Sequence, residues 1–220
     1  MTELKATGWF QGLSQEAMNQ IKSSGTFRTF QEKEIIFLQD DVLTHYFFVV
    51  NGLVRAFHQN KLGKKWIVSL FSQGDLFPHV GLADHAAVYP ASAEALAPTT
   101  LFSIKQTVMQ QLLHRYPVIQ QQFTAFLAMK SQELINRYSD SVLEPALVQL
   151  VSLLKRLAQQ SGMRVSNGWV LIPNLMTEQD MAAYIGVAPE TVSRLLNRLY
   201  RERRAKSAGR GRIYIDLDKC

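Results

Sequence analysis

Acidic, hydroxyl and guanidinium side chains stand close together near the C-terminal end of the chain, in the stretch PETVSRLLNRL. Glu190, Ser193 and Arg194 are spaced so that they share one face of a helix. An arginine can donate two parallel hydrogen bonds to guanine, a glutamate can accept one from cytosine, and a serine can meet several base edges or a phosphate. The pattern predicts contacts to base edges in a DNA major groove.

A concentration of cations accompanies these three residues. Between residues 188 and 212, eight basic side chains are opposed only by Glu190 and Glu202, so this segment carries the chain's whole net charge of +6. Such a patch on an otherwise balanced protein indicates a polyanionic partner, although charge runs also form solvated helix faces. We predict contacts to the DNA backbone from six side chains: Thr191, Asn197, Arg198, Arg201, Arg210 and Arg212.

Two short helices joined by a tight turn would position these residues. Thr177 and Asp180 match a capping box at the start of the first helix. Gly186 tolerates the positive φ of the corner, and Pro189 suits the first position of the second helix. We expect the buried face of the second helix to consist of Val192, Leu195, Leu196 and Leu199.

A glycine-rich turn over residues 207–212 follows the second helix, and the stretch RIYID (212–216) predicts a strand after it. Together they predict a β-hairpin wing in which Arg210 and Arg212 contact phosphate. Because glycine-turn helical hairpins also occur in proteins that bind no DNA, the prediction depends on the conjunction of turn, exposed E-x-x-S-R, basic tail and basic wing.

The preceding chain changes character twice. Residues 13–24 predict an amphipathic helix, and residues 26–105 contain seven short strand-like runs separated by turn signals, typical of an all-β sandwich or barrel. The seven runs are FRTF, EIIFL, HYFFVV, LVRAFH, WIVSLF, SAEAL and TLFSI. Residues 106–137 then have helical periodicity, interrupted at Pro117, and residues 144–160 and 169–172 predict a further helix and strand.

The helix after Pro117 carries a long apolar stripe, formed by Val118, Gln122, Phe126, Met129 and Glu133 with Phe123, Leu127 and Leu134 beside it. A stripe between two domains indicates pairing with a second copy, and the alternative is packing against the β-domain. The polar residues 138–141 interrupt the stripe, and we place the domain boundary there.

Composition excludes several classes of site and location. The single cysteine, Cys220, permits neither an intrachain disulfide nor a four-thiolate iron–sulfur cluster. The N-terminus has no signal-peptide pattern, and no apolar run approaches the roughly 20 residues that span a bilayer, so we expect a cytoplasmic protein without a membrane partner.

An alternative function is a cupin-like metalloenzyme, but the H-x-H pair of such sites is absent from the sequence. A third is a cyclic-nucleotide-regulated module with another output than DNA binding, which the wing and E-x-x-S-R helix disfavour.

From about Phe10 onward, the chain resembles the Crp/Fnr family of bacterial transcription regulators. The resemblance rests on FQGLSQEAMNQI, EIIFLQDD, YFFVVNGLVRAF, FSQGDLFP and, most specifically, TEQDMAAYIGVAPETVSRLLNRL. It implies an α+β fold: a cyclic-nucleotide-binding-like β-roll (1–116), a dimerisation helix and hinge (117–140), and a winged helix-turn-helix (141–220). It also implies a homodimer that binds double-stranded DNA, with RNA polymerase as a partner of an activator, and no enzymatic activity.

Two further implications come from the same resemblance. The set Glu190, Ser193 and Arg194 resembles the Fnr-like branch, which binds TTGA-N6-TCAA palindromes, with Arg194 on the guanine and Glu190 on the opposing cytosine. The β-roll departs from the cyclic-AMP pattern, because His79 stands at its glutamate, and Tyr89 and Pro90 stand near its Arg-Ser pair. We therefore do not expect cyclic AMP, since the fork for its phosphate is absent.

The effector is undetermined by the sequence. Phe77, His79 and Tyr89 are the candidate pocket residues, for a small apolar or acidic effector, and alternatively they fill the core. His79 is also a candidate haem ligand, against the simpler alternative of a polar residue in a vestigial pocket. Arg204-Ala205 replaces the two apolar residues that usually precede the wing in this family, which predicts a more loosely packed wing.

Overall fold

The computed structural model describes residues 4, 7–81, 87–166, 168–173, 176–209 and 211–220. Its contacts divide the chain into two units: residues 1–63 with 68–132, and residues 64–67 with 133–220. The helix α4 (Pro117–Leu143) contributes to both units, up to Gln132 in the first and from Glu133 in the second. It continues through residues 138–141, where the sequence suggested a boundary.

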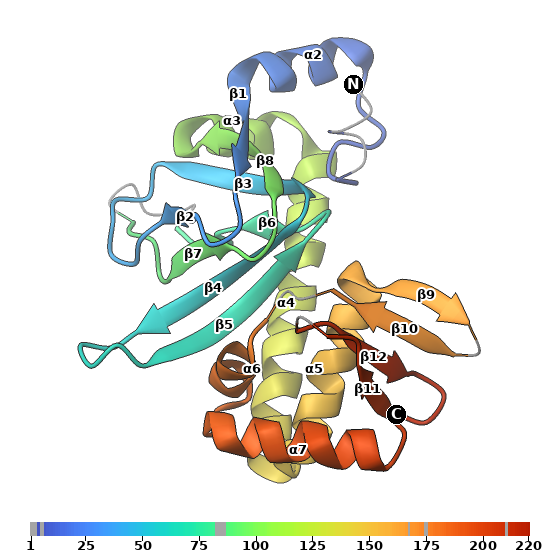
Figure 1. Cartoon of the computed structure of the whole chain (residues 1–220). Helices are drawn as coiled ribbons and strands as arrows, with labels where there is room; N and C mark the ends of the chain where they lie inside the picture. The colour runs from blue at the N-terminus through green and yellow to red at the C-terminus, as the bar shows by residue number, and fades with distance from the viewer. Residues whose placement is uncertain (1–3, 5–6, 82–86, 167, 174–175, 210) are drawn as a thin grey trace. The chain divides into compact units, whose positions relative to one another are not determined.

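The first unit is a β-roll preceded and followed in the chain by helices, of which α2 and α3 lie at the same end of the roll (Figure 1). Helix α2 (Gln15–Ser24) precedes the strands, and α3 (Gln106–Arg115) and α4 follow them. Strands β1 (Gly25–Phe30), β8 (Thr99–Lys105), β3 (His45–Asn51) and β6 (Leu76–Phe77) form one antiparallel sheet in that order. Strands β2 (Ile35–Phe37), β7 (Ser92–Ala95), β4 (Leu53–Gln59) and β5 (Lys65–Ser72) form the other. All seven predicted runs are strands, and the short β6 is an addition.

Both sheets of the roll contribute to one aromatic-rich core. Phe47 and Phe48 of β3, Phe102 of β8 and Val54 of β4 are buried in it. The central strands β3, β7 and β8 are buried along nearly their whole length, as expected for strands covered on both faces. Ile119, Phe123 and Phe126 of α4 complete the same cluster.

The second unit combines three helices after α4 with a four-stranded antiparallel sheet (Figure 1). The helices are α5 (Ala146–Ser161), α6 (Glu178–Ile185) and α7 (Pro189–Arg201). The sheet order is β11 (Ala205–Ser207), β12 (Ile213–Asp216), β10 (Trp169–Ile172) and β9 (Met163–Ser166). Strand β9 was not expected from the sequence, and β11 is the first strand of the predicted wing hairpin, of which only the second strand was named.

Helix α5 packs against this sheet and against α6 and α7. Its Leu150, Leu154 and Leu157 are buried, at the i, i+4, i+7 spacing of one helical face. The amphipathic pattern predicted for residues 144–160 thus forms the support on which the helix-turn-helix rests. Within the described ranges, none of the helices has both the length and the apolar character needed to cross a bilayer.

Candidate nucleic-acid interface

Helix α6 begins with the capping box predicted from the sequence. The Asp180 amide donates to the Thr177 hydroxyl over 3.1 Å, and the Thr177 amide donates to the Asp180 carboxylate over 3.0 Å. Each side chain satisfies a backbone donor that the first turn of the helix leaves without a partner. The start of the helix-turn-helix is therefore fixed locally.

Gly186 ends α6 in the left-handed conformation, with φ of 76°, and its amide donates to Ala182 O over 2.9 Å. A residue with a Cβ is disfavoured at this φ, which explains the glycine. Pro189 then occupies the first turn of α7, where its missing N–H leaves no hydrogen bond unmade. Three residues, Gly186, Val187 and Ala188, are enough to join the helices.

Helix α7 has one buried and one exposed face. Val192, Leu196 and Leu199 are buried as predicted, whereas Leu195 is only half-buried, because it lies at the edge of the apolar face. The exposed side chains are Glu190, Arg194, Asn197, Arg198 and Arg201. Ser193 and Thr191 are half-buried. The predicted base-contacting set thus lies on the first turns of a helix whose opposite side is anchored in the unit.

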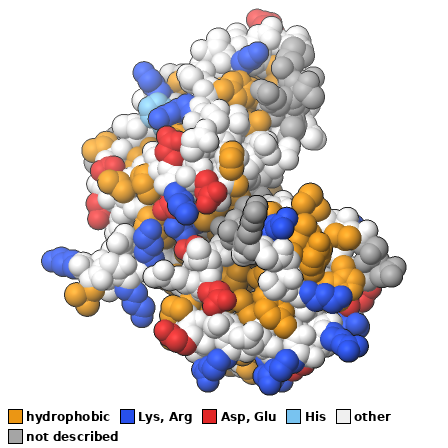
Figure 2. All heavy atoms as spheres, viewed as in Figure 1, with side chains coloured by type: hydrophobic (Ala, Val, Ile, Leu, Met, Phe, Trp, Pro, Cys, Tyr) orange, Lys and Arg blue, Asp and Glu red, His pale blue; other side chains and the backbone are white. Residues whose placement is uncertain are grey.

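The predicted cations of α7 have different local partners. Arg194 Nη2 donates to Thr191 Oγ1 over 3.2 Å, on the same helix. Arg198 Nε donates to Glu202 Oε1 over 2.7 Å, and Arg204 Nη1 reaches the other carboxylate oxygen at 3.3 Å. These hydrogen bonds, that from Arg198 first, lower the pKa of Glu202 below its ordinary value. Figure 2 shows Lys and Arg side chains along the part of the second unit that α7 occupies.

Glu202 is the interface residue that sequence reasoning overlooked. From the sequence alone it was included only as a negative charge opposing the basic segment. Its i, i+4 spacing from Arg198 was the signal that could have predicted their ion pair. Its carboxylate accepts hydrogen bonds from both Arg198 and Arg204, so one acidic side chain pairs with two cations of the basic segment.

The wing forms as a hairpin of β11 and β12, with Ala205 opposite Ile215 and Ser207 opposite Ile213. Arg212 Nη2 donates to Ala208 O over 3.1 Å, and its Nε to Gly209 O over 3.4 Å, so its guanidinium folds onto the wing turn. Arg210 lies outside the described residues. Lys206 Nζ lies 4.2 Å from the centroid of Trp169, a cation–π contact between β11 and β10.

The unusual Arg204-Ala205 pair is accommodated without exposing the wing's base. Ala205 is completely buried, and the Arg204 carbonyl accepts from the Asp216 amide over 2.9 Å. The Arg204 side chain instead turns to Glu202 and to Lys219 O. The looser packing expected at this point is therefore not seen at Ala205, because its small side chain is buried while the half-buried Arg204 side chain turns away to Glu202 and Lys219.

Two of the three candidate effector residues belong to the aromatic core of the β-roll. Tyr89 stacks on Phe37 with centroids 3.7 Å apart, and Phe77 packs against Phe47 at 5.5 Å and Phe71 at 5.0 Å. Phe77 and Tyr89 are 1% and 3% exposed. His79 is half-buried, with its ring 6.1 Å from Phe71 and 6.3 Å from Phe126. The geometry favours the core-filling alternative for Phe77 and Tyr89.

Polar pairs are also buried in the first unit. Arg55 and Glu94, on neighbouring strands, form an ion pair of 2.7 Å with both side chains under a tenth exposed. Lys130 of α4 pairs with Asp75 at 3.0 Å, and its ammonium lies 5.3 Å from the centroids of Phe71 and Phe126. Among the residues that the structure describes, no cluster of three His, Cys, Asp or Glu side chains could hold a metal.

The apolar stripe named from the sequence faces the core rather than solvent at its centre. Phe123 and Phe126 are buried, and Val118 and Leu127 pack partly buried against the same cluster. The exposed apolar side chains of α4 include Met129 and Leu134 of the predicted stripe, together with four further residues: Ile135, Tyr138, Val142 and Leu143. Both readings of the stripe named from the sequence therefore stay relevant, because Phe123 and Phe126 pack against the β-roll while Met129 and Leu134 are exposed.

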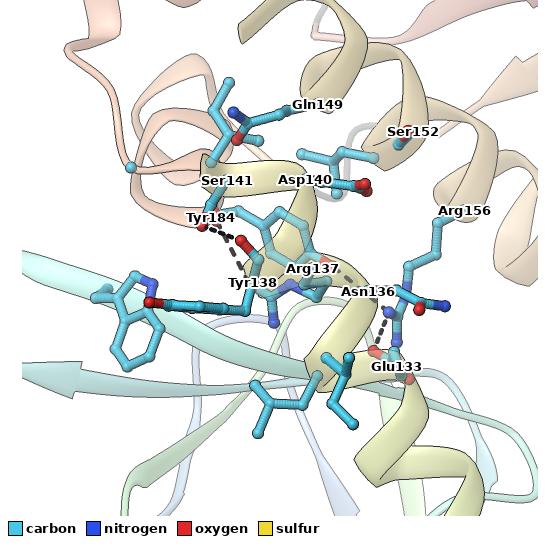
Figure 3. A pocket seen from close by; sticks show the side chains of 16 residues that line it. Glu133, Asn136, Arg137, Tyr138, Asp140, Ser141, Gln149, Ser152, Arg156 and Tyr184 are labelled. Atoms are coloured by element: carbon cyan, nitrogen blue, oxygen red, sulfur yellow. Dashed lines mark hydrogen bonds and ion pairs between the residues drawn. The ribbon is translucent and has the colours of Figure 1, made fainter. Parts of the chain in front are cut away.

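A pocket of about 720 Å³ lies within the second unit, between α4, α5 and the end of α6. Figure 3 shows Arg137, Arg156 and Tyr184 pointing toward one another at its wall. Burial lowers the pKa of the Arg137 guanidinium, and Tyr184 beside it acts in the opposite direction. No pattern in the sequence pointed to these three residues as a group.

Comparison with known proteins assigns both units. A cyclic nucleotide-binding domain model matches residues 27–116, and a Crp-like helix-turn-helix domain model matches residues 148–219. The "Probable transcriptional regulator flp" of Lacticaseibacillus casei is 29% identical over 91% of this chain and 88% of its own length. The "Cyclic AMP receptor protein" of Thermus thermophilus is 28% identical over 90% and 88% of the two chains.

Solved structures with low identity share the fold. The c-di-GMP responsive global regulator CLP of Xanthomonas campestris superposes with a TM-score of 0.77 at 15% identity, over 92% of this chain and 99% of that one. FixK2 of Bradyrhizobium japonicum superposes at 0.73 with 19% identity, over 87% and 92%. The sequence relatives are transcription regulators rather than enzymes. With a cyclic-nucleotide-binding-type domain, a long helix and a helix-turn-helix in this order, the chain belongs to the Crp/Fnr family of DNA-binding transcription regulators.

Proposed function

We propose that the chain acts as a homodimer that binds a palindromic TTGA-N6-TCAA-like site, with one α7 in each of two successive major grooves. The observation that carries this proposal is the placement of Glu190 and Arg194, exposed on the first turns of α7, while Val192 and Leu196 anchor the helix from behind. Arg194 contacts the guanine, Glu190 the opposing cytosine, and Ser193 an adjacent base edge or phosphate.

The backbone contacts in this proposal come from Thr191, Asn197, Arg198, Arg201, Arg210 and Arg212. The first four of these side chains lie on α7, where a groove-bound helix passes near phosphates, and Arg212 folds onto the turn of the wing. Arg210 is included from the sequence alone. Neutralising phosphates releases counterions, so binding should weaken steeply with salt. DNA binding of this kind places the protein's action in the bacterial cytoplasm.

The exposed apolar side chains of α4 support the homodimer. Ile135 and Val142 are 60% and 65% exposed and one heptad apart, and Tyr138 lies between them at 73%. A second copy of the same helix would cover this stripe. Sedimentation of Ile135→Asp should show a shift toward monomer relative to the parent protein, and an unshifted dimer would place the interface elsewhere.

The β-roll is proposed as a sensor that does not take cyclic AMP. The ring of Tyr89, near the position of the phosphate-binding pair, stacks face to face on Phe37 and offers no positive charge. Titration calorimetry with cyclic AMP should show no saturable heat. An absorption spectrum of the purified protein tests haem, for which His79 remains the candidate ligand. An activator would also need to contact RNA polymerase.

Selection of bound duplexes from a random pool tests the central proposal. The expected outcome is a two-fold symmetric motif with half-sites about one helical turn, roughly 34 Å, apart. Enrichment of an asymmetric motif, or no enrichment above that of a random polymer in the presence of cell extract, would contradict it.

A further inference from the structure

Tyr184, on the last turn of α6, is held by an arginine from α4. The Arg137 guanidinium lies 3.9 Å from the centroid of the Tyr184 ring. Its Nη2 also donates to Tyr184 O over 3.4 Å and to Ile67 O over 3.1 Å. A planar guanidinium can stack on a ring and donate from its edge at the same time, which an ammonium cannot. Arg137 therefore fixes both the ring and the backbone of this residue.

A second arginine reaches the other end of the same side chain. Arg156 of α5 donates from Nη1 to Tyr184 Oη over 3.4 Å and forms an ion pair with Glu133 of α4. Glu133 and Arg156 are both largely buried, at 25% and 19% side-chain exposure. Tyr184 is thus contacted by arginines from both α4 and α5 (Figure 3).

Tyr184 lies next to the turn that leads from α6 into α7, so its contacts affect the recognition helix. Only Ile185 separates it from Gly186, where the chain turns into α7. Helices α6 and α7 pack on each other, so a change in the direction of α6 carries α7 with it. The pocket of about 720 Å³ beside Tyr184 leaves space into which an unrestrained ring and helix end can move. Interactions at Tyr184 therefore decide how precisely α7 is oriented on α4.

We propose that Glu133, Arg137 and Arg156 are positioning residues for DNA recognition, which hold the helix-turn-helix at one orientation on α4 through Tyr184. The inference rests on the proposed function, because α4 also carries the stripe proposed to pair two copies. In such a dimer, the orientation of α7 on α4 in each copy sets the distance and angle between the two recognition helices. The Tyr184 cluster then determines the spacing between half-sites that the dimer accepts.

Spacing preference separates this role from simple stabilisation. Inserting one base pair between the half-sites increases their separation by about 3.4 Å and rotates one half-site relative to the other by about 35°, since a turn has 10–10.5 base pairs in roughly 34–36 Å. A dimer with rigidly oriented helices loses affinity for such a site, whereas a dimer with loosely oriented helices adapts. A variant that is merely less stable loses affinity for all spacings in proportion.

The experiment uses the full-length protein and three fluorescent duplexes: the selected palindrome, and versions with one base pair added to or removed from its spacer. The variants are Arg137→Gln, Arg137→Lys and Tyr184→Phe, with Ser139→Ala, an exposed position on the same helix, as the matched control. We expect the parent and control to disfavour the altered spacers by at least about tenfold, the order of one strong mismatch. Arg137→Gln should reduce this penalty at least threefold. Arg137→Lys, which keeps the charge but not the plane, should do so nearly as much.

Tyr184→Phe keeps the ring beside Arg137 but loses the hydroxyl that Arg156 contacts, so it should reduce the spacing penalty by less than Arg137→Gln does, and it folds without an added cavity. Each variant is also tested on the palindrome with its guanine replaced, and this mismatch penalty should stay at the parent value. An unchanged spacing penalty in both Arg137 variants, or an equal loss on all duplexes, overturns the inference. Absence of a sequence or spacing preference in the parent would instead overturn the proposed dimer.

Discussion

Arg194 donates a hydrogen bond to the hydroxyl of Thr191, one turn earlier on the exposed side of α7. The sequence predicts different contacts for the two residues: Arg194 with a base and Thr191 with the DNA backbone. The hydrogen bond restricts the rotamers of a long side chain before DNA binds, and such restriction lowers the entropy lost on binding. We therefore expect Thr191 to orient Arg194 independently of any phosphate contact.

Arg194→Ala should weaken binding to the palindrome by about 1–3 kcal/mol and abolish discrimination at the guanine. Thr191→Val keeps the shape but removes the acceptor, and we expect a smaller loss of about 0.5–1 kcal/mol that is confined to the cognate base. Fluorescence anisotropy with cognate and guanine-substituted duplexes measures both. Equal losses on the two duplexes for Thr191→Val would mean that its hydroxyl serves phosphate alone.

Glu202→Gln should strengthen binding to random duplex DNA by roughly threefold, because Arg198 and Arg204 lose their carboxylate partner and become available to phosphates. The slope of log affinity against log salt should steepen by about 0.9 for each further phosphate that the protein neutralises. Glu16→Gln, which makes the same charge change at an exposed position of the first unit, is the control. If both variants behave alike, net charge rather than the pairing explains the effect.

The elements with strong periodicity were predictable, and those fixed by tertiary pairing were not. All seven runs in residues 26–105 and the capping box of α6 follow local patterns. Strands β6, β9 and β11 have two to four residues and depend on pairing with β3, β10 and β12, which the sequence does not display. The stripe on α4 shows the related limit, because periodicity identifies an apolar face without identifying what covers it.

The candidate site divides in the same way. The exposed positions of Glu190 and Arg194 follow from helical spacing, which a sequence displays directly. The pairings of Glu202 with Arg198 and Arg204, and of Tyr184 with Arg137 and Arg156, depend on rotamers and on contacts distant in sequence. A count of charges includes Glu202 only as one negative charge in the basic segment. The position of its carboxylate, which pairs with Arg198 and Arg204, is not visible in such a count.

Phe77→Ala should lower the free energy of unfolding by about 3–5 kcal/mol, the range for removing a buried aromatic ring. The ring is enclosed by neighbours that include Phe47 and Phe71, so its loss leaves a cavity in the β-roll. Urea denaturation monitored by circular dichroism gives the change. A loss below about 1 kcal/mol would show that the site tolerates an empty space, as the wall of an effector pocket does.

Stability should decline as the pH falls below 6.5 because of His45. Burial first, and then Arg28 and Lys105, lower the pKa of His45 from its ordinary value of 6.5. The unfolded chain then binds this proton more readily than the native one, so the contribution is complete above pH 6.5 and is lost as the pH falls through the lower, native pKa. His45→Gln should flatten this part of the profile, whereas His114→Gln, at an exposed position, should not. Parallel profiles for the parent and His45→Gln would disprove the assignment.

The ion pair of Lys130 with Asp75 should be the most sensitive polar contact between α4 and the β-roll. Lys130 is 8% exposed and lies between Phe71 and Phe126, while Asp75 also accepts from the Ser72 amide over 2.8 Å. Lys130→Met should reduce stability by about 3–5 kcal/mol, because the carboxylate stays buried without its cation.

The double variant Lys130→Met with Asp75→Asn removes both charges and should recover a large part of that loss, since replacing a buried pair by uncharged groups is often close to neutral. Lys22→Met, at an exposed lysine of α2, should change stability by no more than about 0.5 kcal/mol. Urea denaturation of the parent, the single variants and the double variant provides the comparison. The double variant could instead be less stable than Lys130→Met by the full effect of Asp75→Asn alone. The two side chains would then act independently, and the ion pair would not connect α4 to the turn at residues 72–75.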